Sequence, residues 1–255
     1  MQGHEQGQDI QGHDIVVVGF SAGGIQPLMQ LVRDLPSDFP ASLFVVHHFP
    51  PHSVSALPGI IQRAAHLPVA TAGDRDSIAQ GHIYVGRPDH HLLIMPGHIR
   101  LTRGPREHGN RPALDPLFRS AARSYGPRVI GVVLSGTLDD GASGLHAVKS
   151  AGGIAVVQHP RHAEYPGMPR SAIEHVAIDY VMPPEEIGSL LSRLVRQPAP
   201  TPPADAEKIS LDGPVAVGTA PLRPLAPPNV ARTAASLGAD PGVEQTRDPR
   251  RELPW

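Results

Sequence analysis

The sequence contains no cysteine, few aromatic residues, little net charge and no long apolar run. The absence of cysteine excludes a disulfide framework, a thiolate metal site and a cysteine nucleophile. A formal net charge of -2 removes the general electrostatic case for binding nucleic acid or an anionic membrane. No apolar stretch approaches about 18 residues, and the first residues lack the regions of a signal peptide. We therefore expect a cytosolic protein without membrane insertion.

Proline and glycine, by contrast, are abundant, with 30 prolines and 26 glycines in 255 residues. Twelve of the prolines lie in residues 197–255, where no apolar periodicity is found. Residues 1–13 are rich in glutamine and glycine and contain almost no aliphatic side chains. These biases predict a disordered leader over 1–13, one folded domain over 14–196 and a Pro-rich, disordered tail over 197–255.

Between these ends, short β-branched runs alternate with longer helical patterns. The runs are apolar on both faces, which is typical of parallel strands covered by helices. Residues 91–103 instead indicate a hairpin about a Pro-Gly turn. The predicted fold class is α/β: a doubly wound, mostly parallel sheet with helices on both faces and one antiparallel hairpin. The predicted strands cover residues 15–20, 42–48, 82–86, 128–135 and 153–158.

Three helices can be placed from their patterns. Residues 25–35 carry an apolar stripe, with proline in the first turn. Asp115 has the character of an N-cap for a helix that extends to about Ser124. Glu185 and Glu186 are expected to open a last helix, because acidic residues favour the positive end of the helix dipole.

The first strand ends in a glycine-rich turn with Ser21 at its crest. A serine there has its hydroxyl beyond the carboxyl end of the strand, and the N–H groups that follow can face an oxyanion. A nucleotide-binding loop is disfavoured, because Ser21 replaces the middle glycine of that pattern and no acidic residue follows the next strand. A structural cap is the remaining alternative. Supporting groups for an oxyanion or for the turn are Ala22, Gly23 and Gly24.

A serine nucleophile needs a base, and histidine has a suitable pKa. His47 and His48 end the second strand, which neighbours the first in the commonest doubly wound order. Because adjacent strand residues point to opposite faces, only one of the two is expected to reach Ser21. Asp139 and Asp140 lie in a turn after a later strand and could orient the imidazole. The spacing alone does not decide between His47 and His48, or between Asp139 and Asp140.

Two further kinds of protein are disfavoured by the sequence. An α/β-hydrolase fold places Ser, Asp and His in that order, whereas here the order is Ser, His, Asp, so we reject that fold. A zinc site could use His48 and His52, with His90 or His91 as a third ligand. The two prolines between His48 and His52 oppose the helix that this spacing needs. No metal and no cofactor are therefore expected.

Five segments occur in a fixed order along the chain: GFSAGG (19–24), HFP (48–50), RPALDPLFRSAA (111–122), SGTLDDGASG (135–144) and YPGMPRSA (165–172). In these motifs the chain resembles the catalytic domain of chemotaxis protein-glutamate methylesterases of the CheB type, over about residues 14–196. The resemblance places the family's nucleophilic serine on Ser21, its histidine on His48 and its aspartate on Asp140.

The chain departs from the family pattern at two places in these motifs and at its start. The family usually has Thr where Ala22 stands, and Gly-Met-Gly where Gly136, Thr137 and Leu138 stand. The family's active-site Met therefore corresponds to Thr137, which the resemblance implies is a further supporting residue for the oxyanion or the turn. Neither change removes Ser21, His48 or Asp140, which form the catalytic triad that the resemblance implies. Many family members also carry a phosphorylatable receiver domain ahead of the catalytic domain, whereas 13 residues precede Asp14 here.

The resemblance implies hydrolysis of glutamate γ-methyl esters on methyl-accepting chemoreceptors or similar methylated signalling proteins, with deamidation of glutamine as a second activity. Control would then come from abundance or from a separate regulatory partner. The basic side chains Arg103, Arg106 and Arg111 either meet an acidic receptor surface or form a solvated loop. A non-catalytic signalling or docking module that keeps the fold is the alternative function.

Overall fold

The computed structural model describes residues 12–48 and 55–200. Within these ranges no helix is both long enough and apolar enough to cross a bilayer. The elements are β1 (Ile15–Phe20), α1 (Ile25–Arg33), β2 (Ser42–His47), α2 (Leu57–Gln62), β3 (Val69–Thr71), β4 (Ile83–Val85), β5 (His91–Met95), β6 (His98–Thr102), α3 (Leu114–Tyr125), β7 (Val129–Val133), α4 (Ala142–Ser150), β8 (Ile154–Gln158), α5 (Gly167–His175), β9 (Tyr180–Met182) and α6 (Pro184–Leu194).

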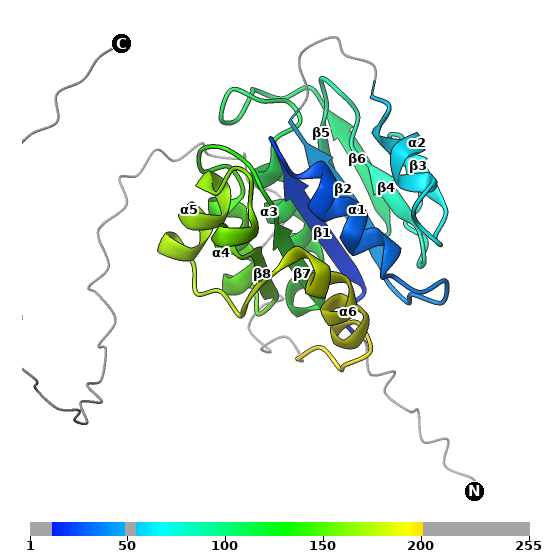
Figure 1. The fold of residues 1–255 in the computed structure, drawn as a ribbon. Coiled ribbons are helices and arrows are strands. Elements are labelled where there is room, and N and C mark those ends of the chain that lie inside the picture. The colour runs from blue at the N-terminus through cyan, green and yellow to red at the C-terminus, as the bar shows by residue number, and fades with distance from the viewer. Residues whose placement is uncertain (1–11, 49–54, 201–255) are drawn as a thin grey trace, which may run out of the picture. The chain divides into compact units, whose positions relative to one another are not determined.

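Seven strands form one parallel sheet in the order β3-β4-β2-β1-β7-β8-β9. The central strand β1 pairs with β2 on one side and with β7 on the other, so that Ile15 lies opposite both Ser42 and Val129. The carboxyl ends of β2, β1 and β7 therefore lie side by side (Figure 1). In open α/β sheets, ligands bind outside the carboxyl ends of the strands, at the point where the strand order reverses.

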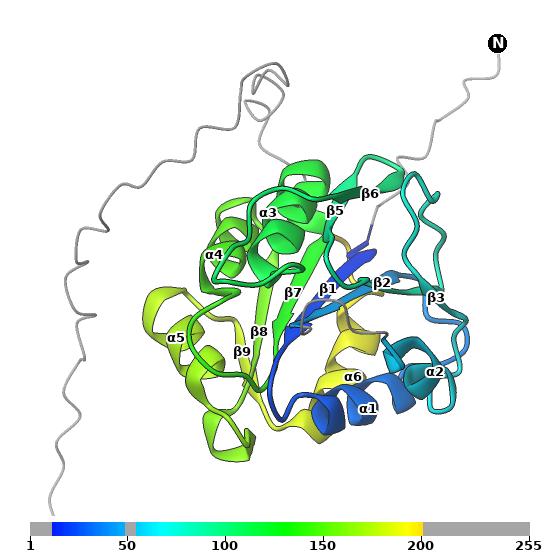
Figure 2. The same ribbon diagram turned by 90° about the horizontal axis from the view of Figure 1, so that it is seen from above.

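Both faces of the sheet are covered. Val16 and Val18 of β1 pack toward α1, α2 and α6, whereas Ile15 and Val17 pack toward α3, α4 and α5. Figure 2 shows the two helical layers on either side of the strands. Burial on both faces explains why these strands read as continuous apolar runs. The predicted α/β class is confirmed.

The predicted hairpin is also present, as β5 and β6. It forms a separate two-stranded sheet and does not extend the main one. Its backbone is joined to α3: the N–H of Ile94 donates to Ser120 Oγ over 3.0 Å, and Ser124 Oγ donates to the Ile94 carbonyl over 2.8 Å. The helix thus satisfies polar groups of β5 that a neighbouring strand would otherwise take.

One helix start was predicted wrongly. The helix α3 begins at Leu114 with Ala113 as its N-cap, so Asp115 is not the cap of its own helix. The Asp115 side chain is buried and instead accepts hydrogen bonds from Gly141 and Gly144 at the start of α4. A tertiary contact therefore replaced the local cap that the sequence indicated.

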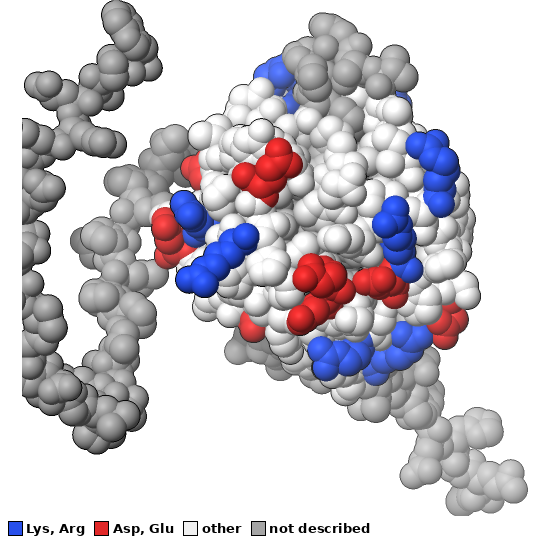
Figure 3. All heavy atoms as spheres, in the orientation of Figure 1, with Lys and Arg blue, Asp and Glu red and all other residues white. Residues whose placement is uncertain are grey.

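The packed part of the chain reaches slightly beyond residues 14–196. Gly12 forms a backbone bridge with Pro198, and the His13 side chain is buried. Residues 1–11 and 201–255 lie outside the described residues, so the disorder expected for the leader and tail stays a prediction. On the face shown in Figure 3, acidic and basic side chains of the described residues are interspersed among uncharged ones.

Candidate active site

Ser21 lies on a tight turn between β1 and α1. Its N–H donates to the Ser135 carbonyl beyond β7 over 2.9 Å, and the Gly24 N–H returns to the Ser21 carbonyl over 3.2 Å. Gly23 has a φ of 70°, in the left-handed region that favours glycine. The Phe20 ring occupies the space that a side chain at Gly24 would need. The turn therefore depends on both glycines and projects Ser21 beyond the strand.

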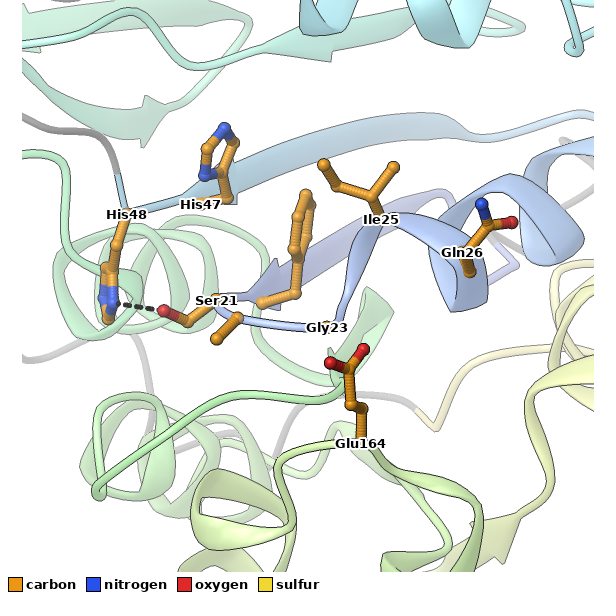
Figure 4. Close-up of a pocket in the computed structure, with 9 residues that line it drawn as sticks. Ser21, Gly23, Ile25, Gln26, His47, His48 and Glu164 are labelled. Atoms are coloured by element: carbon orange, nitrogen blue, oxygen red, sulfur yellow. Dashed lines mark hydrogen bonds between the residues drawn. The ribbon is translucent and has the colours of Figure 1, made fainter.

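His48 follows β2 and faces Ser21 (Figure 4). The Ser21 hydroxyl donates to His48 Nδ1 over 3.1 Å, and His48 Nε2–H donates to Asp140 Oδ2 over 2.7 Å. The His48 side chain is 14% exposed and that of Asp140 is 1% exposed, so the pair is shielded from water. At these distances a base can take the hydroxyl proton while a carboxylate orients the ring. The structure thus brings Ser21, His48 and Asp140 together.

The two other candidates that the spacing left open, His47 and Asp139, have different contacts. His47 stacks on Phe20, with ring centroids 5.0 Å apart. Burial lowers the pKa of His47 to about 4, so this ring is neutral at pH 7. Asp139 is exposed, and its Oδ1 lies 3.3 Å from His108 Nδ1. The alternation of side chains along a strand allowed only one of the two histidines to reach the serine.

The Asp140 carboxylate is fixed by the first turn of α3. The Leu114 N–H donates to Oδ2 over 2.8 Å, and the Asp115 N–H donates to Oδ1 over 3.1 Å. Burial acts to raise the pKa of Asp140, but the hydrogen bonds from His48 and Leu114 and the nearby imidazoles outweigh it and hold this pKa below its usual value. Asp140 is therefore ionised at neutral pH and can stabilise a cation on His48.

A second buried carboxylate, Asp115, lies behind the triad. Its Oδ1 accepts from the N–H groups of Gly141 and Gly144 over 3.0 and 2.7 Å. Asp115 in α3 thus caps α4, while Asp140, just before α4, caps α3. Burial and the neighbouring Asp140 raise the pKa of Asp115. This reciprocal exchange locks the aspartate of the triad between two helix N-termini.

His108 completes this arrangement and was not identified from the sequence. Its Nε2 donates to Asp115 Oδ2 over 3.0 Å and lies 3.9 Å from Asp140 Oδ1. Burial acts to lower the pKa of His108, but the carboxylates of Asp140, Asp115 and Asp139 raise it above its ordinary value. Nothing in the sequence distinguished His108 from the other histidines, because its role depends on contacts across the fold.

The raised pKa of His108 predicts a pH-dependent contribution to stability. A group whose pKa is higher in the folded state contributes fully below its unfolded value of 6.5, and this stability is lost as pH rises through the folded value. Because His108 is an exposed residue, solvent screening weakens its ion pairs, so we expect His108→Gln to lower the free energy of unfolding by roughly 0.5 kcal/mol near pH 5.5 and by less near pH 9.

Urea unfolding at the two pH values measures this difference. His98→Gln is the matched control, because His98 lies on β6 and its Nδ1 bonds the nearby Pro96 carbonyl. An equal loss of stability at both pH values in His108→Gln would contradict the prediction.

His108, Asp115 and Asp140 are also close enough together to share a metal ion. Their ligand atoms already serve other partners: the carboxylates accept four backbone N–H groups, and His108 donates to Asp115. This pattern is that of an ion-paired support for the triad. The contacts of His91 do not support the zinc site considered from the sequence, because both of its ring nitrogens form hydrogen bonds with the backbone, to Pro105 and Ala113. His52, another ligand of that site, lies outside the described residues.

The loop that carries His108 is held by ion pairs. Arg111 binds Asp89 through Nε and a terminal nitrogen at 3.0 and 2.6 Å, and Arg103 approaches the same carboxylate at 3.1 Å. Arg106 donates to the Gly109 carbonyl over 3.3 Å. These arginines therefore order the loop, and two of the three share an internal acidic partner.

An open pocket of about 370 Å³ lies in front of Ser21. Figure 4 shows the Glu164 side chain pointing toward Gly23, and a Cβ added at Gly23 would lie 2.8 Å from Glu164 Cβ. The N–H groups of Ala22 and Gly23 have no acceptor among the described residues and can face an oxyanion. The Gly24 N–H is used within the turn, so this residue supports the turn and not an oxyanion. Thr137 is exposed at the start of the turn that leads to Asp140.

A parallel α/β sheet that joins Ser, His and Asp at its carboxyl edge, beside an open pocket, defines the class: an α/β protein with a site of the serine-hydrolase type. The chain belongs to the CheB methylesterase family, whose family model matches residues 16–191. The family expected from the five motifs is thereby confirmed.

Individual relatives agree with this assignment. A Leptospira interrogans protein is 37% identical over 183 residues, which are 71% of this chain and 95% of that protein. A relative from Anaeromyxobacter dehalogenans, named protein-glutamate methylesterase/protein-glutamine glutaminase 2, is 38% identical over 72% of this chain and 54% of its own length. The chain thus spans about half of some relatives. The catalytic domain of the Thermotoga maritima CheB methylesterase matches with a TM-score of 0.68 and 33% identity, covering 71% of this chain and 98% of that domain.

Proposed function

We propose that the chain hydrolyses γ-methyl esters of glutamate residues in proteins and releases methanol, with deamidation of glutamine as a second activity. The observation that carries this proposal is the hydrogen-bonded line from Ser21 through His48 to Asp140. The names of relatives such as that of Anaeromyxobacter dehalogenans support the substrate, an ester or amide of a glutamate side chain in a protein.

The geometry gives each group a step. His48 accepts the Ser21 proton at Nδ1, and the serine oxygen attacks the ester carbonyl. The N–H groups of Ala22 and Gly23 hold the oxyanion, and the imidazolium returns its proton to the leaving methanol. Water activated by His48 then cleaves the acyl-enzyme. Throughout, Asp140 keeps the proton on Nε2, which leaves Nδ1 free to act as the base.

The proposed substrates are methyl-accepting chemoreceptors or similar methylated signalling proteins in the cytosol. Membership of the CheB methylesterase family supports this class of partner. The alternative function, a docking module without catalysis, shares the fold and predicts no turnover.

Methanol release from a methylated receptor preparation tests the proposal. The purified chain is expected to release methanol in proportion to enzyme concentration, and Ser21→Ala is expected to release none above background. If the wild-type chain releases no methanol, the proposal is wrong and the docking function remains.

A further inference from the structure

Leu138 is an unusual residue in the turn that leads to Asp140. Its φ of 66° lies in the left-handed region, which a branched L-residue enters only at a cost. Its side chain is 72% exposed, so burial does not compensate for this cost. A glycine would fit the same backbone without strain. The side chain therefore contributes little to folding, and strain of this kind gathers at functional sites.

The turn lies directly against the nucleophile. A Cβ added at Gly136 would lie 3.0 Å from Ser21 Cβ. The Gly136 N–H donates to the Tyr165 carbonyl over 2.9 Å, and a Cβ at Gly167 would lie 2.8 Å from the Leu138 nitrogen. The backbone of Leu138 is thus wedged between the segment beside Ser21 and the start of α5.

Exposed apolar side chains occur in the turn that holds Leu138 and in segments next to Ser21 or its pocket. Five large hydrophobic residues of the described chain are exposed, and three of them belong to segments beside Ser21. Ile25 lines the pocket, and Tyr165 follows Glu164, which also lines it. Leu138 is the most exposed of the five. Exposed apolar side chains close to a site are typical of a surface that contacts another molecule.

We propose that Leu138 is a specificity-determining residue that contacts an apolar side chain of the polypeptide carrying the ester. This inference rests on the proposed function. An esterified glutamate can reach Ser21 only if its neighbours in the substrate pass over the rim of the pocket. In a helical substrate, residues three and four positions away lie on the same face as the ester. The preferred substrate is therefore a glutamyl ester with apolar residues at those positions.

Two peptides test the proposal. Each carries one glutamate γ-methyl ester, with leucines in one and serines in the other at the positions three and four residues away on both sides. We expect the wild-type chain to favour the leucine peptide about tenfold in kcat/KM, mainly through KM, since burying leucine side chains favours binding.

Three variants at Leu138 distinguish the effect of its side chain from the effect of its strained backbone. Leu138→Asn removes the apolar surface but keeps a residue that tolerates the left-handed conformation. Leu138→Gly removes both the side chain and the strain. Both variants are expected to bring the ratio of kcat/KM for the two peptides close to one. Leu138→Met keeps an apolar side chain and is expected to retain the preference.

The variant Arg75→Gly controls for the release of backbone strain. Arg75 also has a left-handed φ, 69°, and is exposed in the loop between β3 and β4. Leu138→Gly and Arg75→Gly are each expected to raise Tm by about 2–4 °C through release of strain. Only the first is expected to change the peptide ratio. A purely structural role for Leu138 would change Tm and leave this ratio unaltered.

The outcomes separate this inference from the proposed function. If the wild-type chain hydrolyses both peptides at equal kcat/KM, or if Leu138→Asn retains the tenfold preference, the role of Leu138 is overturned while the esterase activity stands. If the wild-type chain hydrolyses neither these peptides nor a methylated receptor preparation, the proposed function fails and this inference fails with it.

Discussion

Replacement of Ser21 by alanine is expected to lower kcat for methyl-ester hydrolysis by roughly 10⁴- to 10⁶-fold. The Ser21 hydroxyl is the only group of the hydrogen-bonded line that can form the acyl-enzyme, so its removal ends covalent catalysis. His48→Ala is expected to cost as much, because a neutral hydroxyl is a poor nucleophile without its base. Methanol release under saturating substrate measures both losses.

The double variant gives the sharper result. Ser21→Ala combined with His48→Ala is expected to be hardly slower than either single variant, because the groups act as a unit. Ser189→Ala is the control, since this exposed serine on α6 donates to the Glu186 carbonyl and has no other hydrogen-bond partner among residues 12–48 and 55–200. Losses that multiply in the double variant would show that Ser21 and His48 act independently, against the proposed mechanism.

Asp140→Asn is expected to lower kcat by about 10⁴-fold. The carboxylate accepts from His48 Nε2 and from the N–H groups of Leu114 and Asp115. An amide must turn its NH₂ group toward one of these donors. Loss of the acceptor for Nε2–H favours the other tautomer of His48, in which a protonated Nδ1 faces Ser21 and cannot take its proton.

Asp139→Asn is the matched comparison, because it makes the same change one residue away. This side chain is 65% exposed, and its carboxylate contacts His108 and not His48. The kcat of Asp139→Asn is therefore expected to remain within a few-fold of the wild-type value, since an exposed ion pair contributes little. Comparable losses in the two variants would exclude Asp140 as the residue that orients His48.

The sequence alone was sufficient for five of the seven strands of the main sheet, for a physical reason. Strands buried on both faces must be apolar throughout, so β1, β2, β4, β7 and β8 could be found from their composition. The strands β3 and β9 are three residues long and partly exposed at the sheet edges, so their sequences carry no such signal. The helices α2, α4 and α5 were likewise not predicted.

The candidate site could be found only in part from the sequence. Ser21 follows from local chemistry, because a glycine-rich turn after an apolar strand holds a serine at its crest with the hydroxyl exposed. The choice between His47 and His48 depends on which face of the sheet each side chain takes, and the choice between Asp139 and Asp140 depends on the conformation of the turn before α4. The family motifs selected His48 and Asp140, and the tertiary structure joins the same two residues by a hydrogen bond.

The sequence by itself thus determined the α/β class, the position of the serine and the strand ends that supply its partners. Only the tertiary structure decided how the carboxylates are supported. Asp115 and Asp140 exchange caps between α3 and α4 across about 25 residues of chain, and His108 joins them from a separate loop. Contacts at such separation leave no periodicity in the sequence, because they depend on how the helices pack and not on the local pattern around each residue.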